Sequence, residues 1–323
     1  MRVAVVGTGH LGREHARIYA ALPGVTLVGV HDSDPAAAAA AAERAGCAVL
    51  PSLSAVLDAA EAVSVCVPTP AHADVAGACL ESGRHVLVEK PITHDVDSGR
   101  VLCRLAAKRG VVLQVGHIER FNPALAAAAV HVRAPRFVES HRLAPFGRRG
   151  ADVPVVLDLM IHDLDLVLSL VGDEVANIDA SGVAVLTPST DIANARLRFR
   201  NGCVANLTAS RISLEKIRKI RFFQADSYLS VDLFAGQVAM YRKQAGFRAA
   251  DFQAALQRGE SPDLWEAVEA VPVVVHKDEP LRLELESFAA CVSSGGVPAV
   301  RGEDGVRALE VACEIERLLR LDS

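Results

Sequence analysis

The segment Val3-Ala4-Val5-Val6-Gly7-Thr8-Gly9-His10-Leu11-Gly12 decides the fold of this chain. Its apolar residues predict a buried strand from Arg2 to Val6, and the residues from Gly12 to Ala21 predict a helix. Between the two stands the spacing Gly-x-Gly-x-x-Gly. The first glycine permits a tight turn, the second lets a pyrophosphate approach the backbone, and the third lets helix and strand pack closely. The segment therefore predicts a dinucleotide-binding unit.

An acidic residue ends the next predicted strand, Thr26–His31. Asp32 lies where a carboxylate can accept hydrogen bonds from both ribose hydroxyls, and no adjacent Arg or Lys could meet a 2′-phosphate. The alternative is a tight turn that binds no ligand, but such a turn does not explain why an acidic residue, Asp32, follows the second predicted strand. The pattern favours NAD over NADP, with these cofactor-binding residues: Gly7, Thr8, Gly9, His10, Leu11, Gly12 and Asp32.

Short apolar runs alternate with helical stretches through about residue 118. Asp34 is a predicted helix cap, and Pro35 suits the first helical position because its missing N–H costs nothing there. Further buried strands are predicted at Ala62–Val67, His85–Val88 and Val111–Val115. Such alternation is typical of a parallel sheet covered on both faces. We expect an α/β Rossmann domain over residues 1–118.

The pattern changes after Gly116. A long amphipathic helix is predicted from Val155 to Val171, and strict alternation then predicts strands across Ile192–Ala209, with Asn201-Gly202 as a type I′ hairpin turn. Further strands are predicted at Lys216–Phe223, Tyr228–Leu233 and Val271–Val275, and closing helices from about Leu281 and Glu303. We expect an α+β domain over residues 119–323 with a mainly antiparallel open sheet, and closing helices that can pack back on the first domain.

Composition excludes several classes of protein. Hydrophobic residues make up 51% and charged residues 23% of the 323 residues, as in a globular protein, and the net charge of −5 gives no general attraction to nucleic acid or anionic lipid. The 7 cysteines are scattered without a CxxC pair, which indicates free thiols in a reducing compartment rather than a thiolate zinc site. No apolar run reaches the roughly 18 residues of a membrane span. We expect a cytoplasmic enzyme.

Two segments carry candidate catalytic groups. Lys90 follows a predicted buried strand, and ligands of open α/β sheets bind at the carboxyl ends of strands. Asp158, His162 and Asp165 share one face of the predicted helix, where a carboxylate one turn from an imidazole can orient it. The alternatives are an ordinary surface lysine and a solvated polar helix face. A metal bound by the Asp158 group is a further, less favoured alternative.

The segment Gly116-His117-Ile118-Glu119-Arg120-Phe121-Asn122-Pro123 leaves the last predicted strand of the first domain. It is predicted to join the domains and to contribute His117, Arg120 and Asn122 to substrate binding, together with Asp158 and His162. A well-packed interdomain turn is the alternative for each of its residues.

The chain resembles the Gfo/Idh/MocA oxidoreductase family over essentially its whole length. The similar features are the glycine loop with the trailing His15, Val67-Pro68-Thr69-Pro70-Ala71-His72, Glu89-Lys90-Pro91, the Asp158/His162 pair, and the closing segment from Pro280 to Gly305. The chain departs from the family where Pro154-Val155-Val156-Leu157 replaces a glycine-rich lead-in and Met160-Ile161 replaces a small residue, which should alter the shape of the pocket.

The resemblance implies hydride transfer between NAD and a sugar-like alcohol. His162 would exchange the hydroxyl proton, Asp158 would set the tautomer of His162, and Lys90 would stabilise the alkoxide. The nicotinamide end of the cofactor would be framed by Pro68, Thr69, His72, Glu89, Lys90 and Pro91. The family's open sheet face commonly pairs with another subunit, so we expect a homodimer or homotetramer, although Arg196, Arg198 and Arg200 argue against a purely apolar interface.

The Gly116–Pro123 segment and the strand with Arg218-Lys219-Ile220-Arg221 resemble members that oxidise nucleotide-linked amino sugars such as UDP-N-acetylglucosamine. This implies oxidation of the 3-hydroxyl, with Arg120 near the diphosphate. Arg148 and Arg149 could also pair with a diphosphate, although solvated loop arginines are the favoured interpretation. The alternatives are a dehydrogenase of a free sugar or inositol, and a sensor that holds NAD without turnover. Lys90, Asp158 and His162 argue against a sensor, which has no use for them.

Overall fold

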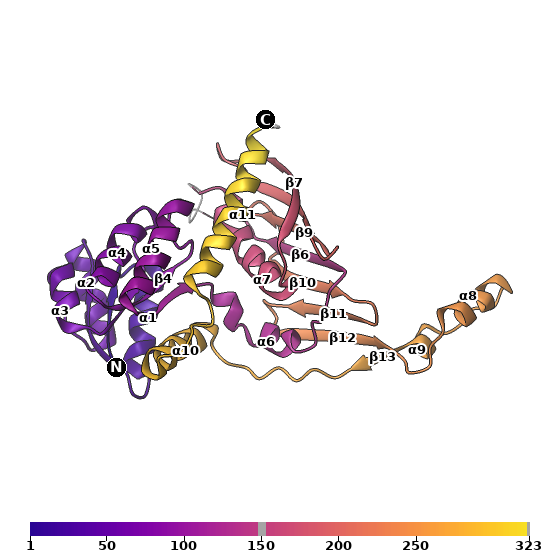
Figure 1. The fold of residues 1–323 in the computed structure, drawn as a ribbon, viewed down its shortest axis with the longest axis horizontal. Coiled ribbons are helices and arrows are strands. Elements are labelled where there is room, and N and C mark those ends of the chain that lie inside the picture. The colour runs from indigo at the N-terminus through magenta and orange to yellow at the C-terminus, as the bar shows by residue number, and fades with distance from the viewer. Residues whose placement is uncertain (148–152, 322–323) are drawn as a thin grey trace. The chain divides into compact units, whose positions relative to one another are not determined.

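The computed structural model describes residues 1–147 and 153–321. The chain divides into two compact units, which are labelled by element in Figure 1. The first unit comprises Met1–Phe121 and Asp278–Glu314, and the second comprises Asn122–Lys277 and Ile315–Ser323. Each unit is built around a β-sheet of its own.

The sheet of the first unit has the strand order β2-β1-β3-β4-β5, and each neighbouring pair is parallel. The strands are β1 (Arg2–Val6), β2 (Thr26–His31), β3 (Ala62–Val65), β4 (His85–Glu89) and β5 (Leu113–Gly116). The runs of β1, β3, β4 and β5 are almost wholly buried, as expected for a sheet covered on both faces, whereas the edge strand β2 is partly buried. The predicted Rossmann architecture is confirmed.

Helices connect these strands. They are α1 (His10–Ala21), α2 (Pro35–Ala45), α3 (Leu53–Ala59), the short η1 (Thr69–Ala71), α4 (His72–Glu81), α5 (Val96–Arg109) and the short η2 (Ile118–Phe121). The predicted cap is present at α2, where the Asp34 carboxylate accepts a hydrogen bond from the N–H of Ala36 and Pro35 occupies the first helical position.

The segment Asp278–Glu314 belongs to the first unit. It lies within the range 119–323 that the sequence pattern assigned to the second domain, whose closing helices we expected to be able to pack back on the first. The reason is apolar packing. Leu285 and Phe288 of α10 (Pro280–Ser294) are fully buried in the same core as Val3 and Val5 of β1. The final helix, α11 (Gly302–Leu321), supplies residues to the first unit up to Glu314.

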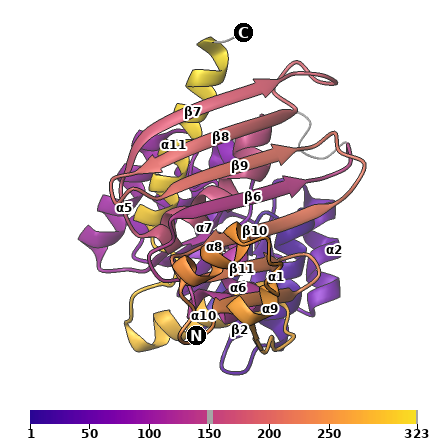
Figure 2. The same cartoon turned by 90° about the vertical axis from the view of Figure 1, so that its right-hand side faces the viewer.

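The sheet of the second unit, seen face-on in Figure 2, has the order β13-β12-β11-β10-β6-β9-β8-β7. Its strands are β6 (Phe137–Leu143), β7 (Val175–Val183), β8 (Ile192–Phe199), β9 (Val204–Ser210), β10 (Ile217–Phe223), β11 (Ser227–Asp232), β12 (Gln237–Lys243) and β13 (Val268–Val271). The pair β6–β9 is parallel and the other neighbours are antiparallel. The predicted mainly antiparallel sheet is confirmed.

The turn between β8 and β9 differs from the predicted type I′ hairpin. Gly202 has φ +86°, but Asn201 is not among the described residues with positive φ, which a type I′ turn requires at both central positions. Instead, the N–H of Gly202 donates to the carbonyl of Phe199, and the N–H of Phe199 donates to the carbonyl of Cys203. This is a longer loop with a left-handed glycine. The Asn201 side chain accepts from the N–H of Cys203 and stabilises it.

The last strand also differs from its prediction. We expected Val271–Val275, but β13 ends at Val271, where it pairs with Met240 of β12. The next residue is Pro272, which lacks the N–H needed to continue the ladder. The valines that follow it therefore leave the sheet despite their high strand propensity.

The two faces of this sheet differ in character. On one face, Val138, Ser140 and Arg142 of β6 are buried, and α6 (Pro123–Ala129) and α7 (Ile161–Val171) contact strands of the sheet. The other face carries a row of partly exposed aromatic side chains with ring centroids 5.0–6.3 Å apart, which we call the aromatic row: Phe137, Phe223, Tyr228, Tyr241 and Trp265. Beyond β12, the connection to β13 contains α8 (Ala249–Gln257) and α9 (Leu264–Ala267), which project from the sheet in Figure 1.

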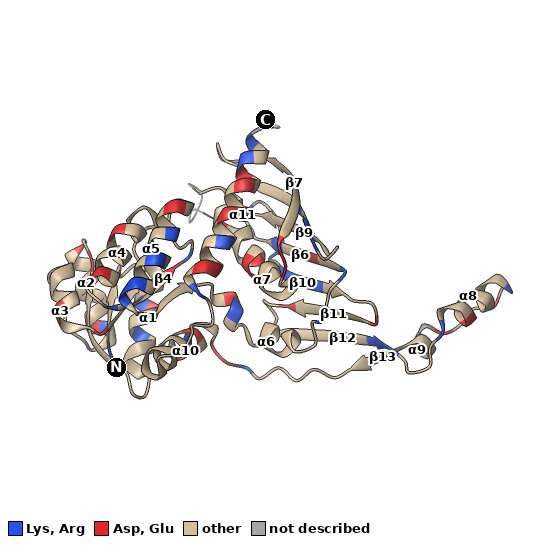
Figure 3. Ribbon diagram, viewed as in Figure 1, with Lys and Arg blue, Asp and Glu red and all other residues tan. Residues whose placement is uncertain are grey.

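Charges are mixed rather than segregated. Figure 3 shows Lys and Arg interspersed with Asp and Glu along α5 and α11. Among the helices that the structure describes, none is long and apolar enough to cross a membrane.

Candidate functional site

The glycine loop between β1 and α1 has little room for side chains. Gly7 has φ +88°, a conformation that L side chains rarely adopt, and its N–H donates to the carbonyl of His31 at 2.8 Å. A Cβ on Gly12 would lie 1.8 Å from the Gly7 carbonyl oxygen. At Gly9, by contrast, a Cβ would meet nothing within 4 Å. Gly7 and Gly12 therefore allow the loop backbone to pack closely against neighbouring backbone, and Gly9 leaves the outer surface of the loop free of side chains.

The open surface at Gly9 coincides with the amino end of a helix. Gly9 is the N-cap of α1, and no hydrogen bond from a described side chain caps the helix there. The first N–H groups of α1 and the positive end of its dipole can therefore serve an anion such as a pyrophosphate. The arrangement fits a dinucleotide, with His10 exposed and Leu11 partly buried beside the loop.

Asp32 lies beside the glycine loop as a fixed carboxylate. Its Oδ2 accepts from the N–H of Thr8 at 2.5 Å and from the Thr8 hydroxyl at 2.9 Å, and its Oδ1 accepts from the N–H of Asp34 at 2.9 Å. Partial burial alone would raise the pKa of this carboxyl, but the hydrogen bonds from Asp34 and Thr8 hold it below its ordinary value. Asp32 is thus an anion suited to accept hydrogen bonds from ribose hydroxyls.

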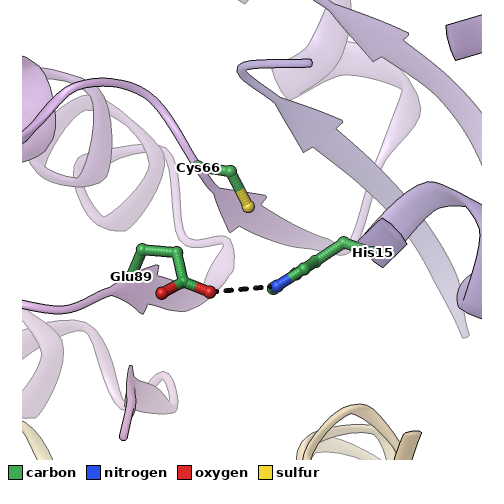
Figure 4. Close-up of side chains that lie close together, drawn as sticks. All are labelled: His15, Cys66 and Glu89. Atoms are coloured by element: carbon green, nitrogen blue, oxygen red, sulfur yellow. Dashed lines mark hydrogen bonds and ion pairs between the residues drawn. The ribbon is translucent and has the colours of Figure 1, made fainter. Parts of the chain in front are cut away.

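A buried hydrogen-bonded chain lies within the first unit, and Figure 4 shows its His15–Glu89 bond with Cys66 nearby. His15 Nε2 is 3.0 Å from Glu89 Oε1, His15 Nδ1 is 3.3 Å from the Ser64 hydroxyl, and Ser64 is 3.0 Å from the Tyr19 hydroxyl. Burial alone would raise the pKa of the Glu89 carboxyl, but its hydrogen bond to His15 and the charges of His15 and Lys90 hold the pKa below its ordinary value. The other oxygen, Oε2, accepts from the N–H of Lys90 at 3.3 Å. Glu89 therefore helps to fix the backbone of Lys90.

His15, Glu89 and Cys66 also form the only group of three potential metal ligands within 4.8 Å of one another among the described residues. Burial raises the pKa of the Cys66 thiol well above its usual range, with Glu89 adding to the effect. Metals bind the thiolate rather than the thiol, so we interpret the group as a histidine–carboxylate pair beside a thiol. Asp158, His162 and Asp165 do not form such a group.

The residues predicted to frame the nicotinamide lie at or just beyond the carboxyl ends of β3 and β4. Pro68 is exposed, whereas Thr69, Lys90 and Pro91 are partly buried. His72 begins α4 and is 1% exposed, with Nδ1 2.8 Å from the Pro91 carbonyl oxygen and Nε2 2.9 Å from the Val67 carbonyl oxygen. These segments share the edge of the sheet at which open α/β folds bind ligands.

The second unit holds the Asp158/His162 pair on a helix that departs from the predicted geometry. Residues Val156–Met160 form a π-helical turn, and α7 begins at Ile161. Such turns are rare and are frequently found at functional sites. Asp158 and His162 are partly buried, whereas Asp165 is 1% exposed. The sequence predicted a regular helix with Asp158, His162 and Asp165 on one face. The structure instead has a wider π-helical turn at Asp158.

Asp163, which the sequence analysis did not single out, anchors this helix. Its carboxylate accepts from Arg142 Nε at 2.8 Å and from Arg142 Nη2 at 3.0 Å, and both side chains are at most 4% exposed. The bidentate pair ties the residue next to His162 to β6. Strand alternation could have provided a signal, since Arg142 shares the inward face of β6 with Val138.

A loop organised by Asp191 supports the start of the same helix. Asp191 is fully buried, and its Oδ2 accepts from the N–H groups of Val185, Leu186 and Thr187 at 2.6–2.9 Å. The carbonyl of the adjacent Thr190 accepts from the N–H of Val155, just before the π-helical turn. Burial alone would raise the pKa of the Asp191 carboxyl, but the backbone donors lower it to about 2.

Replacing Asp191 by Asn should lower the free energy of unfolding at pH 7 by about 2 kcal/mol, because a folded-state pKa below the unfolded one stabilises the ionised protein. The contribution is fully present above the ordinary pKa of 3.8 and disappears as the pH falls toward about 2. Urea unfolding of both proteins at pH 7 and in acid measures the difference. The exposed Asp179→Asn serves as the control. An equal difference at all pH values would contradict the assignment.

The segment predicted to bind substrate contains residues with different surroundings. His117 is 1% exposed and Arg120 is partly buried on η2 of the first unit. Asn122, in the second unit, caps α6 by accepting from the N–H of Ala124, and its amide donates to the carbonyl of Leu233. Asn122 therefore has a clear structural role. Arg148 and Arg149 lie outside the described residues.

The glycine loop, Asp32 and the parallel sheet define the first unit as a dinucleotide-binding Rossmann domain, the fold on which NAD-dependent oxidoreductases are commonly built. Residues 1–117 match the Gfo/Idh/MocA model for the oxidoreductase family with an NAD-binding Rossmann fold, and residues 126–223 match the Gfo/Idh/MocA C-terminal domain. The chain belongs to the Gfo/Idh/MocA oxidoreductase family.

Individual relatives are consistent with this assignment. The chain is 43% identical over 247 residues to a UDP-N-acetylglucosamine 3-dehydrogenase from Acidithiobacillus ferrooxidans, covering 76% of this chain and 78% of the relative. A solved structure with that name and source has a TM-score of 0.90 at 37% identity and covers 99% of this chain and 98% of its own. An inositol 2-dehydrogenase from Rhizobium meliloti is 26% identical over 330 residues, or 97% of this chain and 94% of the relative. The chain is thus related to dehydrogenases that act on sugar hydroxyls.

Proposed function

We propose that this enzyme oxidises the 3-hydroxyl of a nucleotide-linked amino sugar, such as UDP-N-acetylglucosamine, with NAD as the hydride acceptor. The observation that carries the proposal is the 43% identity to a UDP-N-acetylglucosamine 3-dehydrogenase over 76% of the chain. The Gly116–Pro123 segment supports it, since it combines a histidine, an arginine and an asparagine at the end of the last Rossmann strand.

The proposed catalytic roles follow from the chemistry of three side chains. NAD, when bound, supplies the acceptor for the hydride. His162 takes the proton of the sugar hydroxyl as general base, because imidazole titrates near neutral pH. Asp158 sets the tautomer of His162 and binds the sugar, and the Lys90 ammonium stabilises the developing alkoxide. Glu89, bonded to the Lys90 N–H, supports this role by fixing the lysine backbone.

Gly7, Thr8, Gly9, His10, Leu11, Gly12 and Asp32 are the proposed contacts to the adenosine and pyrophosphate portions of NAD. The glycine loop and the ionised Asp32 support that assignment. Pro68, Thr69, His72, Glu89, Lys90 and Pro91 are proposed to frame its nicotinamide end. Their common position beyond β3 and β4 supports this second set.

Substrate assays test the proposal. NADH formation is measured with UDP-N-acetylglucosamine, with free N-acetylglucosamine, and with a panel of free sugars and inositols. We expect turnover with the nucleotide sugar and at least tenfold lower kcat/KM with the free sugar. Turnover with inositols alone would reject the nucleotide-sugar proposal and favour the second candidate, which the 26% identity to an inositol 2-dehydrogenase supports.

Arg120 is the proposed contact to the diphosphate. A guanidinium can bind phosphate through paired hydrogen bonds, which an amide cannot reproduce. Arg120→Gln should therefore raise KM for the nucleotide sugar by about tenfold, the equivalent of one charge-assisted hydrogen bond, with little change in kcat. The exposed Arg109→Gln in the same unit is the control. An unchanged KM in Arg120→Gln would remove the residue from the substrate site.

We also propose that the enzyme is a homodimer or homotetramer. The aromatic row on the open face of the second unit's sheet supports this, because Trp265 at its end is 57% exposed and aromatic side chains are enriched at protein interfaces. Sedimentation equilibrium should give a mass at least twice the 34.2 kDa of one chain, and Tyr228→Arg should lower it. A monomer at micromolar concentration would contradict the proposal.

A further inference from the structure

His72 lies between two backbone carbonyl groups that belong to different segments of the first unit. Its Nδ1 is 2.8 Å from the Pro91 oxygen and its Nε2 is 2.9 Å from the Val67 oxygen. The side chain is 1% exposed, so water cannot replace either contact. Both ring nitrogens therefore face an oxygen at hydrogen-bond distance.

The chemistry of these partners constrains the ring. A backbone carbonyl can only accept a hydrogen bond, so each ring nitrogen must carry a proton to make one. A neutral imidazole carries one N–H, and its bare nitrogen would face an oxygen lone pair. Only the imidazolium has two donors. We infer that His72 is a buried imidazolium that joins the Val67 and Pro91 segments as a double donor.

The charges around His72 act in both directions. Burial disfavours a cation, and so does the amino end of α4, at which His72 lies. Asp74 in the first turn of α4 offsets the helix dipole. Lys90, next to Pro91, adds a positive charge, while the Glu89 carboxylate, whose pKa is held low by His15, adds a negative one. The two hydrogen bonds offset the cost of burying the charge, because bonds from a cation are stronger than bonds between neutral groups.

The double donor connects parts of the cofactor site that are far apart in sequence. Pro91 directly follows Lys90. Val67 lies behind the glycine loop, since a Cβ on Gly7 would come within 2.6 Å of the Val67 N atom. His72 thus fixes the turn that carries Lys90 relative to the backbone that supports the glycine loop. It is a positioning residue, and its effect on turnover rests on the proposed role of Lys90.

The protonation state can be measured without substrate or cofactor. The chain contains 11 histidines, and long-range ¹H–¹⁵N spectra of protein with ¹⁵N-labelled histidine report each ring. The signal that disappears in His72→Gln identifies His72. At pH 7.5, where an unperturbed imidazole is mostly neutral, we expect both His72 nitrogens to show the shifts of protonated nitrogen. One protonated and one bare nitrogen would overturn the inference.

The positioning role is tested separately by NAD binding. His72→Gln removes one of the two donors, and we expect NAD to bind at least tenfold more weakly by calorimetry. The control is His94→Gln, because His94 is an exposed histidine three residues after Pro91. Unchanged NAD affinity in a folded His72→Gln protein would overturn the positioning role. If the enzyme turned over none of the proposed sugar substrates, both measurements would still be interpretable, because neither uses a sugar.

Discussion

Replacing His162 by Gln should lower kcat by a factor of about 10²–10⁴, the usual contribution of a general base. The amide cannot take a proton from the sugar hydroxyl, although its size and polarity remain close to those of imidazole. NAD affinity should stay within about twofold, because His162 lies on the second unit, whereas the glycine loop and Asp32 lie on the first. Stopped-flow NADH formation and NAD titration measure the two quantities.

The exposed His276→Gln provides a matched control in the same unit. A further check uses Asp158→Asn, which should lower kcat less than His162→Gln because it disturbs the base without removing it. If His162→Gln retained more than a tenth of the wild-type kcat, another group would have to be the base.

The second large effect concerns Gly9 and Gly12 of the glycine loop, whose substitution by alanine should impair the protein in different ways. Gly12→Ala should impair folding, because its Cβ would lie 1.8 Å from the Gly7 carbonyl oxygen and 2.9 Å from the Gly7 carbonyl carbon. Both neighbours are backbone atoms that cannot rotate away. Overpacking of this kind costs about 1–3 kcal/mol or more. We expect a lower melting temperature and no measurable NAD binding.

Gly9→Ala should leave stability within about 0.5 kcal/mol, because its Cβ would meet nothing within 4 Å and its φ of −62° suits alanine. NAD affinity should nevertheless fall at least tenfold, since the methyl group would occupy the approach of the pyrophosphate to the backbone. Gly77→Ala on α4, with only an ordinary 3.7 Å contact to Leu102, controls for the substitution itself. Unchanged NAD affinity in Gly9→Ala would place the pyrophosphate elsewhere.

The cofactor unit was predictable because its signals are local. The glycine spacing and the acidic residue after β2 each describe a short stretch of chain, and the steric limits at Gly7 and Gly12 are the physical reason for the spacing. The alternation of Ala193, Ala195 and Leu197 likewise predicts a buried strand face, and these residues are at most 1% exposed.

The remaining features depend on contacts between distant segments. The π-helical turn at Asp158 changes the geometry of a helix that the apolar period predicts to be regular. The Arg142–Asp163 pair joins a strand to a helix, and neither residue identifies the other from sequence. The bonds of His72 to two carbonyls depend on how the segments after β3 and β4 lie in the folded sheet. Any residue type can provide a backbone carbonyl acceptor, so the sequence does not show which residues His72 contacts.

The division of the chain has a consequence for protein engineering. Since α10 supplies Leu285 and Phe288 to the core built on Val3 and Val5, a fragment ending near residue 118 would expose apolar surface that the full chain covers. Such a fragment should aggregate when expressed alone. Suppose that the cofactor preference of a relative were transferred by a single crossover near residue 118. The chimera would then combine the β-sheet of one parent with helix α10 of the other parent. A functional chimera would instead have to carry Asp278–Glu314 together with the amino-terminal segment, as two separate inserts from the same parent.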